Sequence, residues 1–193
     1  MKLVFVAVGI AISLGIYFVL GLYVLPEQYI TRPQSEPQAT LMVHLSDSEI
    51  SLGSSFEVEM ISENIGDMAD ILILSIAFPN LEEIDDEIKI VSYDFTQSPV
   101  YILVGDEIGA EYLTTQKTVL AEYPSIEAYS RPAQTGSAYH MVVDITPKQI
   151  GNFVFYTKSV TLPHQSSLSH FPKEGKIDHS GEFVVVYSVM VNP

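Results

Sequence analysis

The N-terminal end of the chain carries the feature that most restricts its fold, an uncharged apolar run from Leu3 to Leu25. At 1.5 Å of rise per residue this run makes a helix about 34 Å long, enough to cross a hydrocarbon core of about 30 Å. It is longer than the apolar core of a secretory signal, and no small-x-small cleavage pattern follows it. We therefore expect an uncleaved transmembrane anchor over residues 1–25; the alternative is a long signal peptide cut at a cryptic site.

The basic residues near the run predict its orientation. Lys2 precedes it, and the next basic residue is Arg32. Positive charge tends to stay in the cytoplasm, so we expect the N-terminus inside and the rest of the chain outside. The sequence thus predicts a single-pass protein of the cell membrane, held in the bilayer by residues 3–25, with an extracytoplasmic domain.

Small residues recur every four positions in the run, at Ala7, Ala11 and Gly15. Small residues at this spacing let two membrane helices approach closely, so these three positions are candidates for helix association. The alternative is that glycine and alanine are simply common in membrane helices.

After the run, residues 26–40 are polar and contain Pro26, Pro33 and Pro37. A proline-rich polar segment without apolar periodicity forms a semi-extended spacer. Residues 41–193 are then long enough for one domain with a packed core. We expect three parts: an anchor (1–25), a stalk (26–40) and an extracytoplasmic domain (41–193).

The composition excludes several classes of function. Cysteine is absent, which excludes disulfides, thiol nucleophiles and thiolate metal ligands. All 24 acidic residues follow the apolar run, and the net charge is −15. Such a surface repels nucleic acid, and it suits solubility, cations or basic partners.

The remaining sequence is patterned for strands. Residues 56–60 alternate between apolar and acidic, which is typical of a half-buried strand, and residues 71–78 are nearly all apolar, which indicates a central one. The only helix candidate is the short acidic segment 81–88, and residues 163–181 read as a long polar loop. This pattern predicts an all-β domain, a β-sandwich. Further strands are expected at 40–45, 88–95, 100–104, 118–123, 138–146, 153–162 and 183–191.

A resemblance narrows the fold. The segment Glu49–Asp67, with a glycine turn, an alternating strand and then Asn64-Ile65-Gly66-Asp67, looks like the start of CARDB-type immunoglobulin-like modules. The turn through Gly151 into the next strand resembles a late strand of that fold. Glycine suits such turns because it adopts positive φ freely. The resemblance implies an immunoglobulin-like sandwich of a membrane-anchored archaeal or bacterial surface protein, acting in adhesion, assembly or spacing.

Three histidines and an aspartate of the 163–181 loop are candidate metal ligands: His164, His170, Asp178 and His179. Imidazole and carboxylate groups suit copper or zinc, and residues 177–183 faintly resemble a strand entry of CopC-type copper carriers. Those carriers use an N-terminal histidine, which an uncleaved anchor excludes. Ordinary polar loop histidines are the alternative.

A second metal candidate is the acidic cluster of Glu82, Glu83, Asp85 and Asp86. Carboxylate oxygens suit calcium, which stiffens many extracellular modules. The D-x-D-x-D-G loop is missing, and the alternative is a solvated acidic surface.

Known catalytic motifs are also missing, including G-x-S-x-G, H-E-x-x-H and glycine-rich phosphate loops. We therefore expect a non-catalytic protein without a cofactor. Its expected role is protein–protein interaction with a membrane or surface protein, as an accessory subunit or as an adhesion or spacing module. The alternative is an extracytoplasmic domain that binds copper or calcium.

Overall fold

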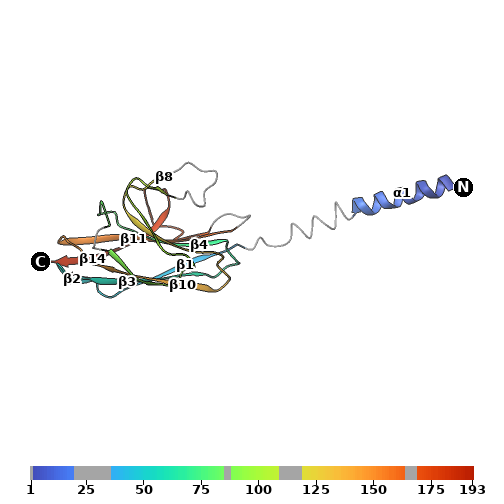
Figure 1. The fold of residues 1–193 in the computed structure, drawn as a ribbon. Helices are drawn as coiled ribbons and strands as arrows, with labels where there is room; N and C mark the ends of the chain where they lie inside the picture. Colours follow the sequence, from blue (N-terminus) through green and yellow to red (C-terminus); the bar gives the residue numbers. More distant parts are fainter. Residues whose placement is uncertain (1, 20–35, 85–87, 109–118, 164–168) are drawn as a thin grey trace. The chain divides into compact units, whose positions relative to one another are not determined.

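A computed structural model describes residues 2–19, 36–84, 88–108, 119–163 and 169–193 (Figure 1). The expectations for Asp85, Asp86 and His164 lie outside these residues. The chain forms two compact units, residues 1–35 and 36–193. In the first unit, helix α1 spans Lys2–Val19. Within the described residues, no helix combines the length and apolar character needed to cross a membrane.

The second unit contains two main β-sheets, as predicted. The first is fully antiparallel, in the order β1-β3-β10-β5. Its strands are β1 (Ala39–Leu45), β3 (Phe56–Asn64), β5 (Ile88–Tyr93) and β10 (Ser137–Ile145).

The second sheet has the order β13-β14-β11-β4-β9-β6, with β12 paired to β11 and β2 paired in parallel to β14. Strands β7 and β8 form a separate two-stranded sheet. The bounds are β2 (Glu49–Ser51), β4 (Ile71–Ala77), β6 (Val100–Ile102), β7 (Glu107–Ile108), β8 (Val119–Leu120), β9 (Ser125–Ser130), β11 (Gly151–Leu162), β12 (Ser169–Phe171), β13 (Lys176–Ile177) and β14 (Phe183–Asn192).

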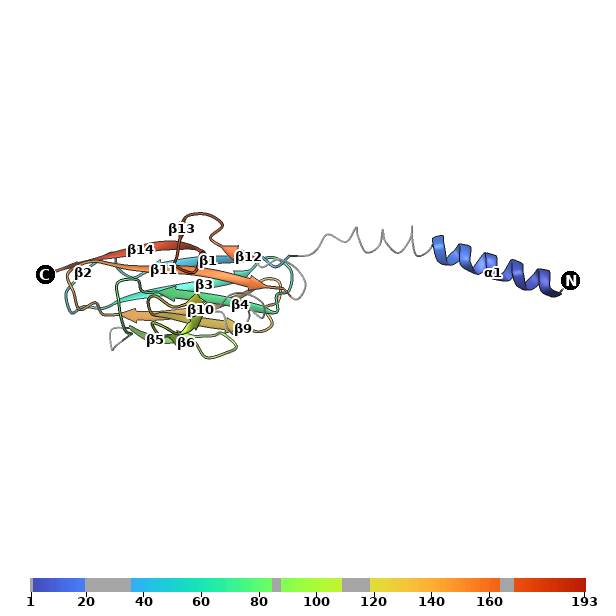
Figure 2. The ribbon, with the colours of Figure 1, turned by 90° about the horizontal axis from the view of Figure 1, so that it is seen from above.

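The topology is that of an immunoglobulin-like β-sandwich. The order β1-β3-β10-β5 corresponds to A-B-E-D of an immunoglobulin constant-type domain, and β14-β11-β4 corresponds to G-F-C. Strands β9 and β6 extend the second sheet beyond this common core, on the side where Figure 2 also places β5.

Alternating side chains of the two sheets build the core. The inward residues of β3, which begin with Phe56, are fully buried, and the Phe56 ring meets that of Phe153 on β11 edge-on at 6.0 Å. The five central residues of β4 are all buried, because β11 and β9 flank this strand and other segments cover its outer face. This confirms the prediction of a central strand at 71–78.

The Asn64-Ile65-Gly66-Asp67 turn binds the first described residues of the domain, 36–38, through hydrogen bonds. The buried Asn64 side chain accepts hydrogen bonds from the amides of Gln38 (3.0 Å) and Gly66 (3.2 Å), and donates to the carbonyls of Asp67 (2.6 Å) and Ala133 (3.2 Å). All four hydrogen-bonding positions of the amide are therefore used.

Gly66 is required here by a close approach of two backbone segments. A Cβ atom at this position would lie 2.3 Å from the carbonyl oxygen of Glu36. The expected positive φ occurs at Gly53 (86°) and Gly151 (116°), whereas Gly66 keeps an ordinary φ.

Two expectations are corrected. Residues 81–84 do not form the predicted helix, and Ile88 begins β5 instead; closely spaced carboxylates destabilise a short helix, and the alternating pattern that starts at Ile88 favours a strand. The 163–181 segment is not wholly a loop, because it contains β12 and β13.

Candidate functional site

The outer face of the second sheet holds a buried charged cluster centred on Lys158 of β11. Its Nζ lies 3.2 Å from Oδ2 of Asp178 and contacts Oε2 of Glu182. The side chains of Lys158 and Asp178 are 12% and 5% exposed. Both acidic partners come from the segment that covers the sheet between β13 and β14.

Strand register explains why a lysine fits at this place. Lys158 lies opposite Ser75 on β4, and Ser75 lies opposite Glu127 on β9. The small serine leaves room for the two long side chains on either side of it. Glu127 is buried, and its carboxylate accepts a hydrogen bond from the hydroxyl of Tyr129.

A tight turn fixes the carboxylate of Asp178. Its Oδ1 accepts three hydrogen bonds, from the amide of Ser180 (2.9 Å), the hydroxyl of Ser180 (2.6 Å) and the amide of Glu182 (3.0 Å). Its Oδ2 is left to face Lys158. The two oxygens of this carboxylate therefore have different partners.

The cluster shifts the pKa of both charged partners. Burial alone would lower the pKa of Lys158, but the carboxylates of Glu182 and Asp178 outweigh it and raise the pKa above its ordinary value. Burial alone would raise the pKa of Asp178, but the Lys158 ammonium and the Ser180 hydrogen bonds hold it below its ordinary value. The pair is thus charged at neutral pH.

The structure brings three of the four predicted loop ligands to this region. His170 lies with Nδ1 3.0 Å from the carbonyl oxygen of Pro172 and Nε2 4.0 Å from Oε2 of Glu182. His179 packs edge-on against the Tyr123 ring at 4.5 Å, and its Nε2 accepts the Glu122 amide hydrogen bond.

In the part of the chain that the structure describes, His170, Asp178 and His179 do not form a metal centre. No group of three His, Asp or Glu side chains there is arranged to hold an ion. The carboxylates of Asp178 and Glu182 already contact the Lys158 ammonium, which occupies the place that a cation would take.

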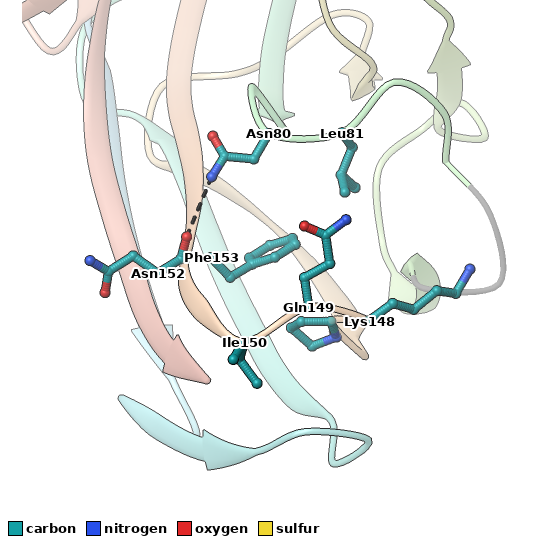
Figure 3. A pocket seen from close by; sticks show the side chains of 8 residues that line it. Asn80, Leu81, Lys148, Gln149, Ile150, Asn152 and Phe153 are labelled. Atoms are coloured by element: carbon teal, nitrogen blue, oxygen red, sulfur yellow. Dashed lines mark hydrogen bonds between the residues drawn. The ribbon is translucent and has the colours of Figure 1, made fainter. Parts of the chain in front are cut away.

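The described half of the predicted acidic cluster, Glu82 and Glu83, is exposed on the irregular segment after β4. It lies next to a pocket of about 220 Å³ at one end of the sandwich. The pocket is lined by Asn80, Leu81, Pro147, Lys148, Gln149, Ile150, Asn152 and Phe153. Figure 3 shows Leu81 and Gln149 pointing toward each other across it, and Asn80 donating to the Asn152 carbonyl oxygen.

Another surface feature lies on the side of the sandwich where β5 and β6 end their sheets (Figure 2). Among the described strands, β5 pairs with β10 alone and β6 with β9 alone. Asp94 is the only charged residue from Ile90 to Gly105. Six large apolar side chains in that stretch are exposed: Val91, Tyr93, Val100, Tyr101, Leu103 and Val104.

Of the predicted helix-association positions, the structure describes the surroundings of Gly15. A Cβ atom built there would meet nothing within 4 Å among the described residues, apart from its chain neighbours and the backbone of its own helix. Ala7 and Ala11 lie within α1, outside the residues whose side chains are described.

Sequence reasoning missed Lys158 and Glu182. The sequence does mark Lys158 as unusual, because it is the only charged residue in the predicted strand 153–162. A lysine that is the only charge in a largely buried strand is expected to have an acidic partner. Asp178 was singled out, but as a metal ligand.

Comparisons with known proteins give a fold likeness only. No family model matches the chain, and no curated protein matches it. The cohesin module of a family 33 glycoside hydrolase from Clostridium perfringens is 14% identical, with a TM-score of 0.41, over 82% of this chain and 98% of that one.

Two further solved structures resemble the chain at a similar level. The CARDB domain of a Pyrococcus furiosus protein, in complex with di-metal ions, is 10% identical with a TM-score of 0.37, covering 81% of this chain and 89% of that one. AvmM, which catalyses macrocyclisation in alchivemycin A biosynthesis, is 11% identical with a TM-score of 0.39, covering 83% and 90%. Likeness this distant carries no argument about function.

Proposed function

We propose that the chain is a non-catalytic, single-pass membrane protein that presents its sandwich outside the cell and binds a partner protein along β5 and β6. It would serve as an accessory subunit of a membrane complex or as a surface adhesion or spacing module. The observation that carries the proposal is the exposed apolar surface on this side of an otherwise acidic domain.

The physical case rests on charge and on β5 and β6, which each pair with a single strand among the described residues. An edge strand offers free N–H and C=O groups to an incoming strand, and its alternate side chains supply specificity. The exposed rings of Tyr93 and Tyr101 are of the type that anchors protein interfaces. A net charge of −15 repels acidic proteins elsewhere on the surface, whereas the nearly neutral stretch 90–105 does not.

The membrane part of the proposal rests on the sequence. The uncharged run continues to Leu25, beyond the described end of α1 at Val19. Lys2 before it and the proline-containing stalk after it favour an extracytoplasmic domain. The spacing of Ala7, Ala11 and Gly15 supports pairing of this helix with a partner helix or a second copy. The likeness of residues 49–67 to CARDB-type modules supports a role at the surface of an archaeal or bacterial cell.

Site-specific photo-cross-linking in native membranes tests the binding surface. A photoreactive residue replaces Tyr101 on β6, and Met42 on β1, also exposed, is the matched control on the other sheet. We expect one defined protein, identified by mass spectrometry, to be cross-linked from position 101 and not from position 42. Equal labelling from both positions, or none from either, would reject this surface.

The anchor has a separate test. The full chain should stay with membranes after alkaline carbonate washing, and a chain without residues 1–25 should be released. Protease added to intact cells should cut the domain if it lies outside. Release of the full chain by carbonate would refute the anchor without bearing on the cross-linking result.

Metal binding is a second candidate function, which one observation favours. The Nδ1 atom of His170 faces the carbonyl oxygen of Pro172, while Nε2 is buried and has no hydrogen-bond partner among the described residues. A histidine ligand is commonly held in this way. Copper titration of the full chain and of a His170→Ala/His179→Ala variant tests it; unchanged binding would remove the histidines as ligands. Calcium at the acidic cluster is tested in the same titration format with a Glu82→Gln/Glu83→Gln variant.

A further inference from the structure

The surroundings of Lys158 and Asp178 have the parts that amide formation requires. The nucleophile, Nζ of Lys158, lies 3.2 Å from Oδ2 of Asp178 and is therefore held beside the carboxyl group that it would attack. The same nitrogen contacts the carboxylate of Glu182, which is in place to move protons.

The other oxygen of Asp178 sits in a preformed hole for negative charge. Two amide groups and one hydroxyl donate to Oδ1, from Ser180 and Glu182, at 2.6–3.0 Å. Donors aimed at one oxygen of a carboxyl group stabilise the charge that develops there when a nucleophile adds to the carbon.

From this geometry we propose that Lys158 and Asp178 condense to an intramolecular amide bond, with Glu182 as the proton carrier. Nζ attacks Cγ of Asp178, and the resulting oxyanion on Oδ1 is held by the Ser180 and Glu182 donors. Glu182 takes two protons in turn from Nζ and passes both to Oδ2. The Cγ–Oδ2 bond breaks, and Oδ2 leaves as water.

The reaction balances without another reactant. An ammonium and a carboxylate become one neutral amide and one water molecule, with no change in oxidation state. A cavity of about 20 Å³, lined by both Lys158 and Asp178, has room for one water molecule beside the reacting groups.

Burial acts in favour of the product. It works against the ammonium form of Lys158 and the carboxylate form of Asp178, so it favours the neutral amine and acid that react. The mutual attraction of the two charges opposes this and slows the reaction. Once formed, the amide removes two charges from a site where they are costly to keep.

The bond would fasten the segment that covers the outer face of the second sheet. It would join β11 to the turn after β13 and close a loop that contains β12. In a chain without cysteine this is a covalent tie of the kind that a disulfide provides in other extracellular domains.

Mass spectrometry of the intact full chain, purified in mild detergent, tests the proposal. We expect a mass lower than that of the sequence by one water molecule, and a protease fragment in which the peptide with Lys158 is joined to the peptide with Asp178. Lys158→Arg and Asp178→Ala should each restore the full sequence mass. Asp178→Asn should still react, with loss of ammonia, and reach the same product mass as the unaltered chain.

The Glu182→Gln variant tests whether Glu182 carries protons in the reaction or only supports the local structure. It should slow the appearance of the lighter species at least tenfold, while circular dichroism shows the same β-sheet content. A full sequence mass for the unaltered chain after prolonged incubation at neutral pH, with normal cleavage after Lys158, would overturn the proposal and leave an ion pair only. The wild-type readout needs no variant to fold, and it is independent of whether β5 and β6 bind a partner.

Discussion

Ser62 of β3 and Ser159 of β11 share a hydrogen bond of 2.6 Å that joins the two sheets through the core. Both side chains are fully buried. A polar contact inside a sandwich fixes how one sheet is placed on the other, because each hydroxyl needs its partner once water is excluded.

Loss of one partner of this pair should destabilise the domain. Ser159→Ala leaves the Ser62 hydroxyl buried and unpaired, at a cost of about 1–3 kcal/mol in the free energy of unfolding. The double variant Ser62→Ala/Ser159→Ala should cost less than the two single changes added together. Urea denaturation of all four proteins measures the coupling; strictly additive effects would show that the bond contributes nothing.

Gly66→Ala should weaken the entrance of the domain. The new Cβ atom would meet backbone atoms of residues 36–38 at 2.3–2.8 Å, and these cannot move without breaking the bonds from the Ile65 and Asp67 amides. We expect a loss of about 1–3 kcal/mol. Thermal unfolding measures it, and Ile65→Ala, a change at an exposed neighbour, is the control that should be near neutral.

Two tyrosines, the half-buried Tyr123 and the buried Tyr129, should respond oppositely to removal of the hydroxyl. Tyr123 has no hydrogen-bond partner for its hydroxyl among the described residues, whereas Tyr129 donates to Glu127. Tyr123→Phe should therefore be neutral or stabilising, and Tyr129→Phe should cost about 1–3 kcal/mol because it leaves a buried carboxylate short of a donor. Equal effects in denaturation experiments would contradict this assignment.

The pKa of Tyr123 also predicts behaviour in alkali. Burial, and then the nearby charge of Asp178, raise the pKa of this phenol above its ordinary value of 10.0. The stability that the protonated Tyr123 phenol contributes is complete below the pKa that this group has in the unfolded chain. It falls as the pH rises above that value, because the unfolded chain releases the proton first. Ultraviolet titration should show tyrosine ionisation that is delayed to higher pH, and Tyr123→Phe should reduce the size of this late phase.

The difference in stability between two variants of Lys158 should depend on pH in the acid range. Lys158→Arg keeps a cation beside Asp178, and Lys158→Met leaves the buried carboxylate unpaired, so the methionine variant should be less stable by about 3 kcal/mol at neutral pH. The pKa of Asp178 is depressed by its cation, so this advantage is present above pH 3.8 and is lost as the pH falls through the lower folded value. A constant difference between the two variants across this range would show that the charge of position 158 is unimportant.

The sequence predicted the sandwich because its main strands carry local signals. The alternation that begins at Phe56 and the apolar run at 71–78 both became strands with the predicted burial. Strand β9 was missed because its residues, Ser125, Glu127 and Ser130 among them, read as polar. They are buried only because neighbouring segments cover this face of the second sheet, which no local pattern records.

The charged cluster could be predicted only in part. Asp178 and the loop histidines stood out by residue type, but Lys158, the partner of Asp178, lies 20 positions earlier in the chain, on β11. Contacts across such a separation depend on strand register, which a single sequence leaves undetermined. The structure therefore adds an ammonium–carboxylate contact at Asp178 that the metal-site prediction did not include.

The Asn64 junction has a mechanical consequence. Within the sandwich unit, the segment that leads into β1 and the C-terminus lie at opposite ends (Figure 1), and β1 runs antiparallel along β3 from Ala39 to Leu45. Tension applied between these ends pulls β1 lengthwise, so its ladder bonds are loaded in shear together instead of opening one by one like a zipper. The hydrogen bonds that join residues 36–38 to the Asn64 turn are loaded first. They keep the first β1–β3 hydrogen bonds from breaking one at a time.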